Sequence, residues 1–326
     1  MQNTPAKSPM GIDLSSLDPA LIDQFRQILL GDVSQLPPFA VDMLRSMGIE
    51  PPQDAAERQA KAVRELGLER NVEELREKGY TIARNAFSHE MADRIRKRMY
   101  EVHEENLTKG IVTMGGEKGP TGRTVFRLVE RGRVFEEAAM NPVLLTLMTS
   151  VLGHGLTIST FTGMIRPQGT PRLPLHSDNQ FMPAPFTEWQ QGATAVWYLE
   201  DVTAEAGASR VVPGSTHRKR HPGPNEGEDE WVPLEAPKGS LAMWVANTWH
   251  GNCARTIPGE RVTLHTAFTR MHMRPIERYD SLPQAVLDRN PPLFAQLVGR
   301  TLPYGCGPAG PDQLAMLKAH LMTHSV

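Results

Sequence analysis

The chain has 326 residues, and its 35 lysines and arginines nearly balance its 37 aspartates and glutamates, which leaves a formal net charge of -2 at pH 7. This length suffices for one large domain with extensions or for two domains, and it can bury a sizeable core. The balanced charge argues against a dedicated nucleic-acid-binding protein, because such proteins usually carry a basic face.

The sequence contains no recognisable targeting or membrane segment. No apolar run is long enough to span a bilayer, and the N-terminal residues, with Asp13 and Asp18 among polar neighbours, lack the basic start and apolar centre of a signal peptide. The two cysteines, Cys253 and Cys306, are too few for a disulfide framework. We therefore expect a cytoplasmic protein with free thiols and no membrane partner.

Residues 1–70 are predicted to form an N-terminal helical extension. Apolar residues recur at helical spacing between Asp18, a candidate N-cap, and Gly31, and proline pairs separate this segment from two further helices. The three predicted helices cover residues 18–30, 39–47 and 55–66. The extension is interpreted as a cap on the core or on a second subunit, and a lid over a substrate pocket is the alternative.

Residues 71–275 are predicted to form the main domain, and residues 276–326 a C-terminal helical tail packed on the core. Helices are expected at 72–79, 91–107 and 141–152, and in the tail at 282–289, 292–297 and 312–322. Strands are expected at 80–83, 156–166, 193–199, 209–212 and 261–269, and residues 234–245 bring the chain back toward His250. Residues 110–122 and 217–230 are expected to be loops, the second with mutually compensating charges. The tail completes either a pocket or an oligomer interface, so a homo-oligomer is possible.

Three potential metal ligands stand in the main domain. His176 and Asp178 are two positions apart, so on an extended segment their side chains point to the same side, and His250 follows 74 positions later. Two imidazoles and one carboxylate that leave other positions open form the facial triad of non-haem Fe(II) oxygenases. Zinc is also chemically possible.

Arg261 adds a cation to this pattern, eleven residues after His250. Pro258-Gly259 is a turn signal between them, so His250 and Arg261 are expected on neighbouring antiparallel strands. A guanidinium there could bind the far carboxylate of a dicarboxylic keto acid whose 2-oxo end chelates the metal. Zinc hydrolysis gives Arg261 no comparable role, which favours iron.

With these residues, the sequence resembles the phytanoyl-CoA dioxygenase family of Fe(II)/2-oxoglutarate-dependent oxygenases over roughly residues 72 to 272. The matching pieces are residues 175–178, 196–203 with Gly207, 211–217, 249–251 and Arg261. The resemblance implies a mainly β fold with flanking helices, a double-stranded β-helix of the jelly-roll or cupin type. It also implies that His176, Asp178 and His250 bind Fe(II) and that Arg261 binds 2-oxoglutarate.

The activity implied by the resemblance is hydroxylation of an unactivated C-H bond in a small-molecule substrate, with O2 as second co-substrate and succinate and CO2 as products. Asp178 argues against a halogenase, where Ala or Gly is expected at this place. Desaturation, epoxidation and ring expansion stay open. The alternative from another class is a metal-binding or small-molecule-binding protein on the same barrel that does not turn over.

Weaker predictions concern the surroundings of the metal. The resemblance also suggests four residues for the co-substrate pocket, Arg166, Asn252, Thr194 and Trp197, and each could instead be a packing residue. The loop after Asp178 faces substrate in many proteins; its candidates are Gln180, Phe181, Met182, Phe186 and Trp189, although Phe186 and Trp189 could merely plug the barrel. His265 shares strand parity with Arg261 and is expected to touch co-substrate or substrate, or to be a core residue. His89 and His103 are expected at the surface.

Overall fold

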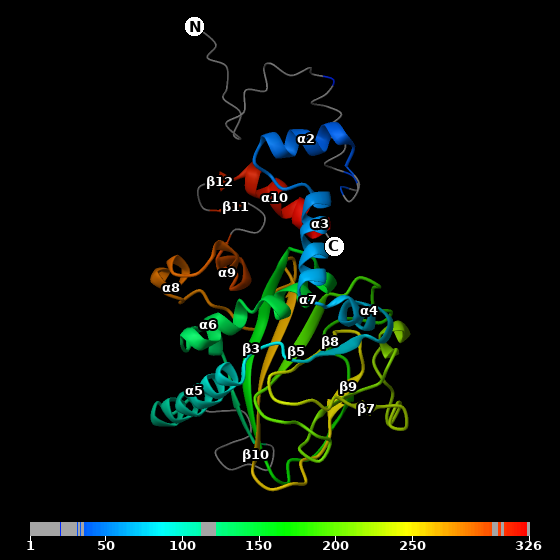
Figure 1. The fold of residues 1–326 in the computed structure, drawn as a ribbon, viewed down its shortest axis with the longest axis vertical. Coiled ribbons are helices and arrows are strands. Elements are labelled where there is room, and N and C mark those ends of the chain that lie inside the picture. The colour runs from blue at the N-terminus through cyan, green and yellow to red at the C-terminus, as the bar shows by residue number, and fades with distance from the viewer. Residues whose placement is uncertain are drawn as a thin grey trace.

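Two antiparallel sheets form the centre of the protein (Figure 1), whose computed structural model describes residues 20, 31, 33, 36–111, 122–301, 306–307 and 310–324. The large sheet has the strand order β1-β8-β5-β10-β3-β2 and the small sheet the order β4-β9-β6-β7. The large sheet comprises β1 (Tyr80–Ala83), β8 (Leu241–Val245), β5 (Gly192–Tyr198), β10 (Glu260–Arg270), β3 (Leu156–Pro167) and β2 (Arg123–Val125). The small sheet comprises β4 (Leu173–His176), β9 (His250–Asn252), β6 (Ser209–Val211) and β7 (Val232–Pro233), and a separate hairpin pairs β11 (Cys306–Gly307) with β12 (Gly310–Pro311).

The helices flank these sheets, and several begin and end where the sequence predicts. Ser88 caps α5 by accepting the Met91 N-H at 3.1 Å, and Gly79 ends α4 with a positive φ of 80°. None of the described helices combines the length and the apolar character needed to cross a bilayer. The helices are α2 (Pro38–Ser46), α3 (Pro52–Glu65), α4 (Glu69–Lys78), α5 (His89–Thr108), α6 (Arg133–Ala139), α7 (Pro142–Leu152), α8 (Gln284–Asp288), α9 (Pro292–Leu297) and α10 (Gln313–His324), with short 3-10 turns at Leu128–Glu130 and Ser215–Arg218.

Some sequence predictions need correction or lie outside the described residues. The helix predicted at 18–30 and most of the loop at 110–122 fall among residues that the structure does not describe. The short helix α6 and the edge strand β2 were not predicted. His89 is exposed as expected, but the prediction for His103 was wrong, because it faces the inner side of α5 and is only 2% exposed.

Strand alternation divides the core into two layers. On β5, Ala195 and Trp197 belong to the large apolar cluster between the sheet and the helices. Val196 and Tyr198 point the other way and belong to a smaller cluster that includes Val211 of β6, hence to the space between the two sheets. The large sheet therefore presents one face to helices and the other to the small sheet.

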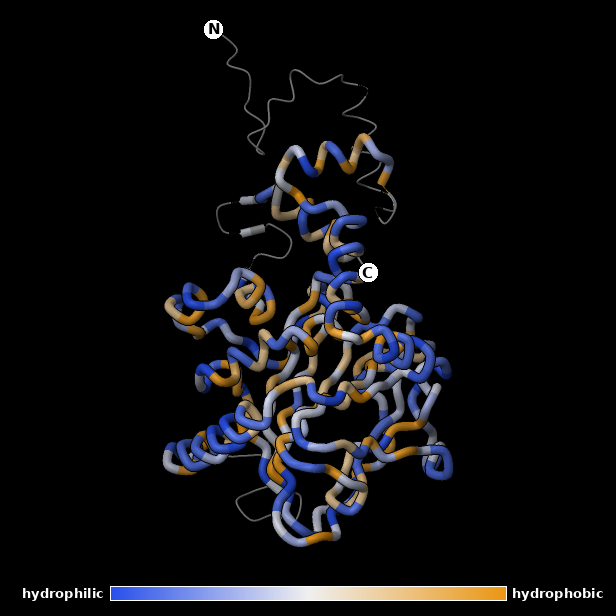
Figure 2. Tube along the Cα trace, in the orientation of Figure 1, coloured by the Kyte–Doolittle hydropathy of each residue, from blue (hydrophilic) through white to orange (hydrophobic). Residues whose placement is uncertain are grey.

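Helices α2 and α10, which are far apart in the sequence, pack together. Ala40 and Leu44 of α2 form a small separate cluster with Leu321 of α10. Helix α3 is anchored to α7, because the Gln59 amide donates to Thr146 O at 2.8 Å. Figure 1 shows α2, α3 and α10 together beyond the end of the large sheet, and Figure 2 shows hydrophobic and hydrophilic residues alternating along α2. The division of the chain near residues 70 and 275 stays a prediction.

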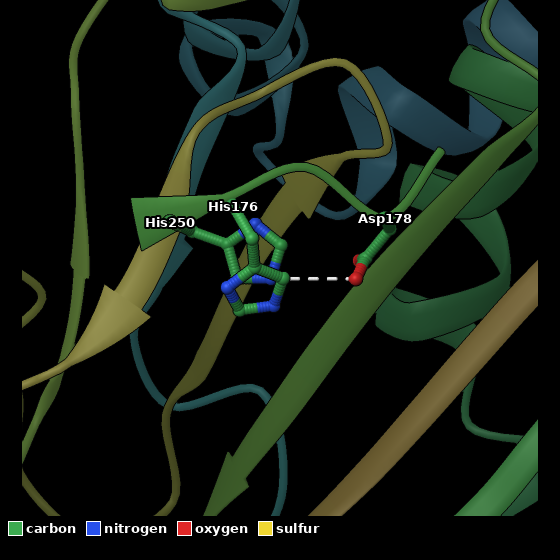
Figure 3. Close-up of side chains that lie close together, drawn as sticks. All are labelled: His176, Asp178 and His250. Carbon is green, nitrogen blue, oxygen red and sulfur yellow. Dashed lines mark ion pairs between the residues drawn. The ribbon is translucent and has the colours of Figure 1, made fainter. Parts of the chain in front are cut away.

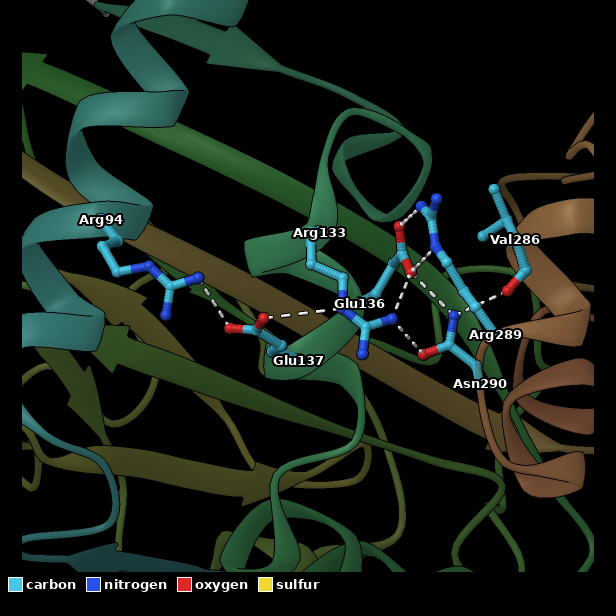
Figure 4. Close-up of polar contacts among 7 residues, drawn as sticks. All are labelled: Arg94, Arg133, Glu136, Glu137, Val286, Arg289 and Asn290. Carbon is cyan, nitrogen blue, oxygen red and sulfur yellow. Dashed lines mark hydrogen bonds and ion pairs between the residues drawn. The ribbon is translucent and has the colours of Figure 1, made fainter.

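A buried carboxylate ties the first part of the tail to α6. The Glu136 side chain is 2% exposed and accepts hydrogen bonds from Arg289, from Asn290 at 2.7 Å and from Arg133 at 3.1 Å (Figure 4). Phe294 of α9 belongs to the main core. This part of the tail is thus packed on the main domain.

Candidate metal and co-substrate site

The three predicted metal ligands converge at one end of the small sheet. β4 pairs with β9 so that His176 lies opposite His250, and Asp178 follows β4 directly. One ligand atom of each residue lies within 4.8 Å of the others. The imidazole rings are 4.3 Å apart between centroids, and Asp178 Oδ1 lies 3.4 Å from His250 Nε2 (Figure 3).

Backbone carbonyls orient both imidazoles. His176 Nδ1 lies 3.0 Å from Pro174 O, and His250 Nδ1 lies 3.0 Å from Thr248 O. A carbonyl oxygen only accepts, so each Nδ1 carries the hydrogen and each Nε2 keeps a free lone pair. Outer partners of this kind are typical of metal-binding histidines. Burial, followed by the neighbouring His250, lowers the pKa of His176, which keeps that ring neutral and able to bind a metal.

Two residues of the large sheet orient Asp178. Its Oδ2 accepts a hydrogen bond from Thr194 Oγ1 at 3.0 Å and another from Trp244 Nε1 at 3.2 Å. Oδ1 is thereby turned toward His250. Burial alone would raise the pKa of Asp178, but its interactions with the imidazoles of His250 and His176 and the hydrogen bond from Thr194 outweigh this effect, so the pKa is lowered and the carboxylate is ionised.

This donor set fits a divalent metal ion. Ligand atoms about 2.1 Å from one ion at right angles are about 3 Å apart, close to the separation of Asp178 Oδ1 and His250 Nε2. Two neutral imidazoles and one carboxylate on one side leave the other positions open, which is the arrangement of non-haem Fe(II) sites.

Arg261 is a buried cation with unused hydrogen-bonding capacity. It is 4% exposed, and its Nε has no hydrogen-bond partner among the described residues. Burial, with the neighbouring cations Arg166 and Arg255, lowers the pKa of Arg261 to about 10, so it stays protonated at neutral pH. A buried guanidinium without a counter-ion is costly unless an anion binds there. The site therefore fits a carboxylate-bearing co-substrate.

The strand assignment of Arg261 corrects one prediction. His250 lies on β9 of the small sheet and Arg261 on β10 of the large sheet, so the two are not on neighbouring strands. The chain between them crosses from one sheet to the other. Arg261 instead lies opposite Arg166 of β3 in the β10-β3 register, and a role of Arg166 in the co-substrate pocket stays a prediction.

His265 lies on the same face of β10 as Arg261, by alternation. It is opposite Val196, two residues along β5 from Thr194, so it lies between the level of Asp178 and that of Arg261. Its Nε2 is 3.1 Å from Thr263 Oγ1. Burial, together with the charges of Arg261 and Arg166, lowers the pKa of His265 to about 3, so the ring is neutral.

The remaining co-substrate candidates are Thr194, Asn252 and Trp197. Thr194 contacts Asp178, and Asn252 follows His250 on β9 with its amide donating to Cys253 O at 3.0 Å. The prediction for Trp197 was wrong. Its side chain is fully buried on the helix-covered face, with its ring 4.7 Å from that of Phe87, because it is three positions from Thr194 on one strand.

The loop after Asp178 carries two strongly exposed aromatic side chains. Phe181 is 92% exposed and Trp189 66% exposed, Gln180 is exposed, and Met182 is partly buried. Phe186 is 3% exposed and packs edge-on against His221, with ring centroids 4.8 Å apart, so it fills space beneath the loop, which agrees with the packing alternative.

Sequence reasoning missed two residues that support the ligands. Trp244 donates a hydrogen bond to Asp178. It lies opposite Thr194 in the β5-β8 pairing, so strand alternation could have predicted that both side chains face the same side of the sheet. His221 lies in the loop at 217–230, where ion pairs such as Arg220 with Glu226 confirm the predicted charge compensation. The Nδ1 of His221 also lies 2.9 Å from the Oγ of Ser177, the residue between the ligands His176 and Asp178. No local pattern signals that contact.

Known proteins resemble this chain in sequence and structure. The family model for phytanoyl-CoA dioxygenase (PhyH) matches residues 75–263. Dioxygenase af480 of Aspergillus fumigatus is 27% identical over 240 residues, which cover 72% of this chain and 77% of that protein. The non-heme alpha ketoglutarate dependent carbocyclase SnoK from nogalamycin biosynthesis has a TM-score of 0.52 at 17% identity and covers 65% of this chain and 93% of its own. HygX from Streptomyces hygroscopicus, solved with nickel and 2-oxoglutarate bound, has a TM-score of 0.51 at 16% identity, with coverages of 65% and 90%. These structural likenesses confirm the predicted jelly-roll fold with flanking helices.

Proposed function

Because the chain belongs to the phytanoyl-CoA dioxygenase family of Fe(II)- and 2-oxoglutarate-dependent oxygenases, we propose that it hydroxylates an unactivated C-H bond of a small-molecule substrate. The observation that carries this proposal is the combination of two unlike sites between the same two sheets. One is the triad of His176, Asp178 and His250, and the other is the buried, unpaired Nε of Arg261. A metal-binding barrel needs only the first of these.

Each residue has a distinct task in this proposal. The Nε2 atoms of His176 and His250 and Oδ1 of Asp178 hold the metal, and Arg261 binds the far carboxylate of 2-oxoglutarate. When bound, Fe(II) with 2-oxoglutarate and O2 supplies the oxidising power, and succinate and CO2 are released. The apolar layer between the sheets keeps water away from the co-substrate. His265, neutral and placed between the two binding groups, offers a ring nitrogen for a hydrogen bond to co-substrate or substrate.

The reaction outcome depends on which bonds of the substrate lie next to the metal. Desaturation, which removes hydrogens from two adjacent carbons, and epoxidation, which adds oxygen to a C=C bond, would use the same metal and co-substrate. The carboxylate of Asp178 occupies the coordination position that a halogenase would leave for chloride, which argues against halogenation. In a metal-binding protein without turnover, the guanidinium of Arg261 would have no binding partner.

Anaerobic reconstitution tests the proposal. Fe(II) and then 2-oxoglutarate are added to the wild type, to His176→Ala and to the matched control His217→Ala, whose imidazole bonds the Glu77 carbonyl outside the triad. A weak visible charge-transfer band is expected in the wild type and the control but not in His176→Ala. Candidate substrates are then screened by succinate release. A wild type that shows no band and retains zinc or no metal would reject the oxygenase.

A further inference from the structure

A cavity of about 230 Å³ lies at the start of β3, beside the segment that follows β10 and the end of α9. Met271, Met273 and Val298 give it apolar walls, while Thr157 and Arg274 contribute polar groups. A cavity of about 150 Å³ holds benzene, and pockets for whole ligands measure roughly 300–1,000 Å³. This cavity therefore suits one end of a larger molecule.

Thr157 provides an unused hydrogen-bonding group in this cavity. Its side chain is 8% exposed, and its Oγ1 has no hydrogen-bond partner in the part of the chain that the structure describes. A buried hydroxyl without a partner costs free energy, which a bound ligand would recover. Thr157 lies opposite Thr269 on β10, and by alternation it faces the same side of the sheet as His265 and Arg261.

Arg274 provides an unpaired cation at the rim. It is exposed and makes no hydrogen bond or ion pair with any described residue. Arg278 also lines the cavity, but it is paired with Asp280 at 2.6 Å. The charges near the cavity thus leave the Arg274 guanidinium available to an anion.

Two acidic residues line the cavity, Glu277 and Asp280; Asp280 is paired with Arg278, and the oxygens of Glu277 are already engaged. They accept the backbone N-H groups of Arg127 and Phe161 at 2.8 Å each and the Tyr279 hydroxyl at 2.5 Å. Glu277 is 7% exposed. Its carboxylate is therefore held by the fold and is not the partner of Arg274.

The cavity is within reach of the metal ligands. Thr194, which holds Asp178, pairs with Ala267, two positions from Thr269, and Thr269 pairs with Thr157. Two strand spacings and two residue steps correspond to about 12 Å between Thr194 and Thr157. Thr194 and Thr157 thus lie on the same face of the large sheet, within the span of one elongated ligand.

We propose that this cavity is a subsite for the anionic end of an elongated, mainly apolar substrate, a carboxylate or phosphate monoester, whose reacting carbon lies at the metal. Arg274 binds the charged group and Thr157 donates a hydrogen bond to one of its oxygens. This proposal deepens the proposed function, and the position of the reacting carbon rests on that function. The anion site itself does not depend on it.

Calorimetry with simple amphiphiles tests the subsite on the full chain loaded anaerobically with Fe(II) and 2-oxoglutarate. The probes are decanoate, decyl phosphate and the neutral 1-decanol. At least one anion should bind more tightly than the alcohol, and the tighter anion distinguishes carboxylate from phosphate. Arg274→Gln should weaken anion binding about tenfold, the loss expected of one charge-assisted hydrogen bond, and leave 1-decanol unaffected. The matched control Arg278→Gln should bind all three probes as the wild type does.

Thr157→Val separates a binding role from a structural one. It should weaken binding of the preferred anion but raise the thermal unfolding midpoint of the unliganded protein, because it removes an unpaired buried hydroxyl. A lowered midpoint would assign Thr157 a structural role and contradict the subsite. Equal losses in Arg274→Gln and Arg278→Gln, or no binding of either anion, would also overturn it.

The metal-binding variant keeps the two proposals distinguishable. His176→Ala should retain anion binding that depends on Arg274. In the wild type, the bound probe should also shift the visible band of the Fe(II) and 2-oxoglutarate complex, and Arg274→Gln should abolish that shift at the same probe concentration. Anion binding without any band would reject the oxygenase and leave the anion site standing. A band without anion binding would reject the subsite alone.

Discussion

The Thr194 hydroxyl donates a hydrogen bond to Oδ2 of Asp178 at 3.0 Å. Thr194 belongs to the large sheet, whereas Asp178 follows a strand of the small sheet. The contact therefore fixes the carboxylate across the space between the sheets, and Trp244 from the neighbouring strand β8 shares the same oxygen. The position of one metal ligand thus depends on how the two sheets face each other.

Thr194→Val should weaken Fe(II) binding about tenfold, because Asp178 loses one of the two donors that hold Oδ1 toward the metal. Binding is measured anaerobically by competition with a chelator of known affinity. Thr160→Val is the matched control, since Thr160 lies at the same level of the sheet on β3, opposite Ala267, and makes no hydrogen bond to a ligand. An unchanged affinity in Thr194→Val would remove the residue from this role.

His221→Ala should also weaken metal binding, by roughly tenfold, through Ser177. The lost contact is the one between His221 Nδ1 and Ser177 Oγ at 2.9 Å, which holds the segment between His176 and Asp178. The far-ultraviolet spectrum should not change, because the rest of the loop keeps its ion pairs. His217→Ala, in the same loop, should bind Fe(II) as the wild type does. Equal effects of both changes would indicate a general loosening of the loop.

Arg261→Gln should raise the 2-oxoglutarate concentration needed for half-maximal development of the visible band by at least about 10-fold. The reason is the loss of a charged hydrogen-bonded pair, worth about 1.5–3 kcal/mol. Arg261→Lys should recover part of this, because it keeps the charge but not the bidentate geometry. Arg172→Gln is the control, an exposed arginine paired with Glu228. Co-substrate dependence equal to the wild type would exclude Arg261 from binding it.

The local parts of the fold and the metal ligands could be predicted from the sequence. Caps and strand alternation act over a few residues, which is why α5 begins after Ser88 and β10 alternates as expected. His176 and Asp178 are likewise linked by local geometry. The orientation of Trp197 was predictable as well, since residues 194 and 197 of one strand cannot face the same side.

Long-range pairings could not be predicted in this way. β9 has three residues, too few for a pattern that would assign it to one sheet, so His250 and Arg261 were expected on neighbouring strands. The contact of His221 with Ser177 joins residues 44 positions apart through a loop without periodicity. His103 was misassigned because a helix pattern does not say which neighbours cover each face. These failures concern tertiary packing rather than local conformation.

His265 should make the stability of the metal-free protein depend on pH. Its pKa is about 3 in the folded state and near 6.5 in the unfolded state, so the unfolded state binds the additional proton between these values. Stability from this residue is thus complete above about pH 6.5 and falls as the pH decreases toward 3. Urea unfolding should show about 1 kcal/mol less stability at pH 5.5 than at pH 7.5 from His265. In His265→Gln this contribution should disappear, and an unchanged difference would contradict a partly buried imidazole that stays neutral in the folded state.

Glu136→Ala should lower the free energy of unfolding by about 2 kcal/mol. Removing one member of a buried ion pair costs about 3–5 kcal/mol, and the loss is reduced here because Arg133 and Arg289 are half exposed and regain water. The measurement is urea unfolding followed by circular dichroism. Glu137→Ala is the matched control on the same helix: its pairs lie at the surface, so it should cost less than about 1 kcal/mol. If the two variants were equally stable, the Glu136 contacts in Figure 4 would not hold the tail on α6.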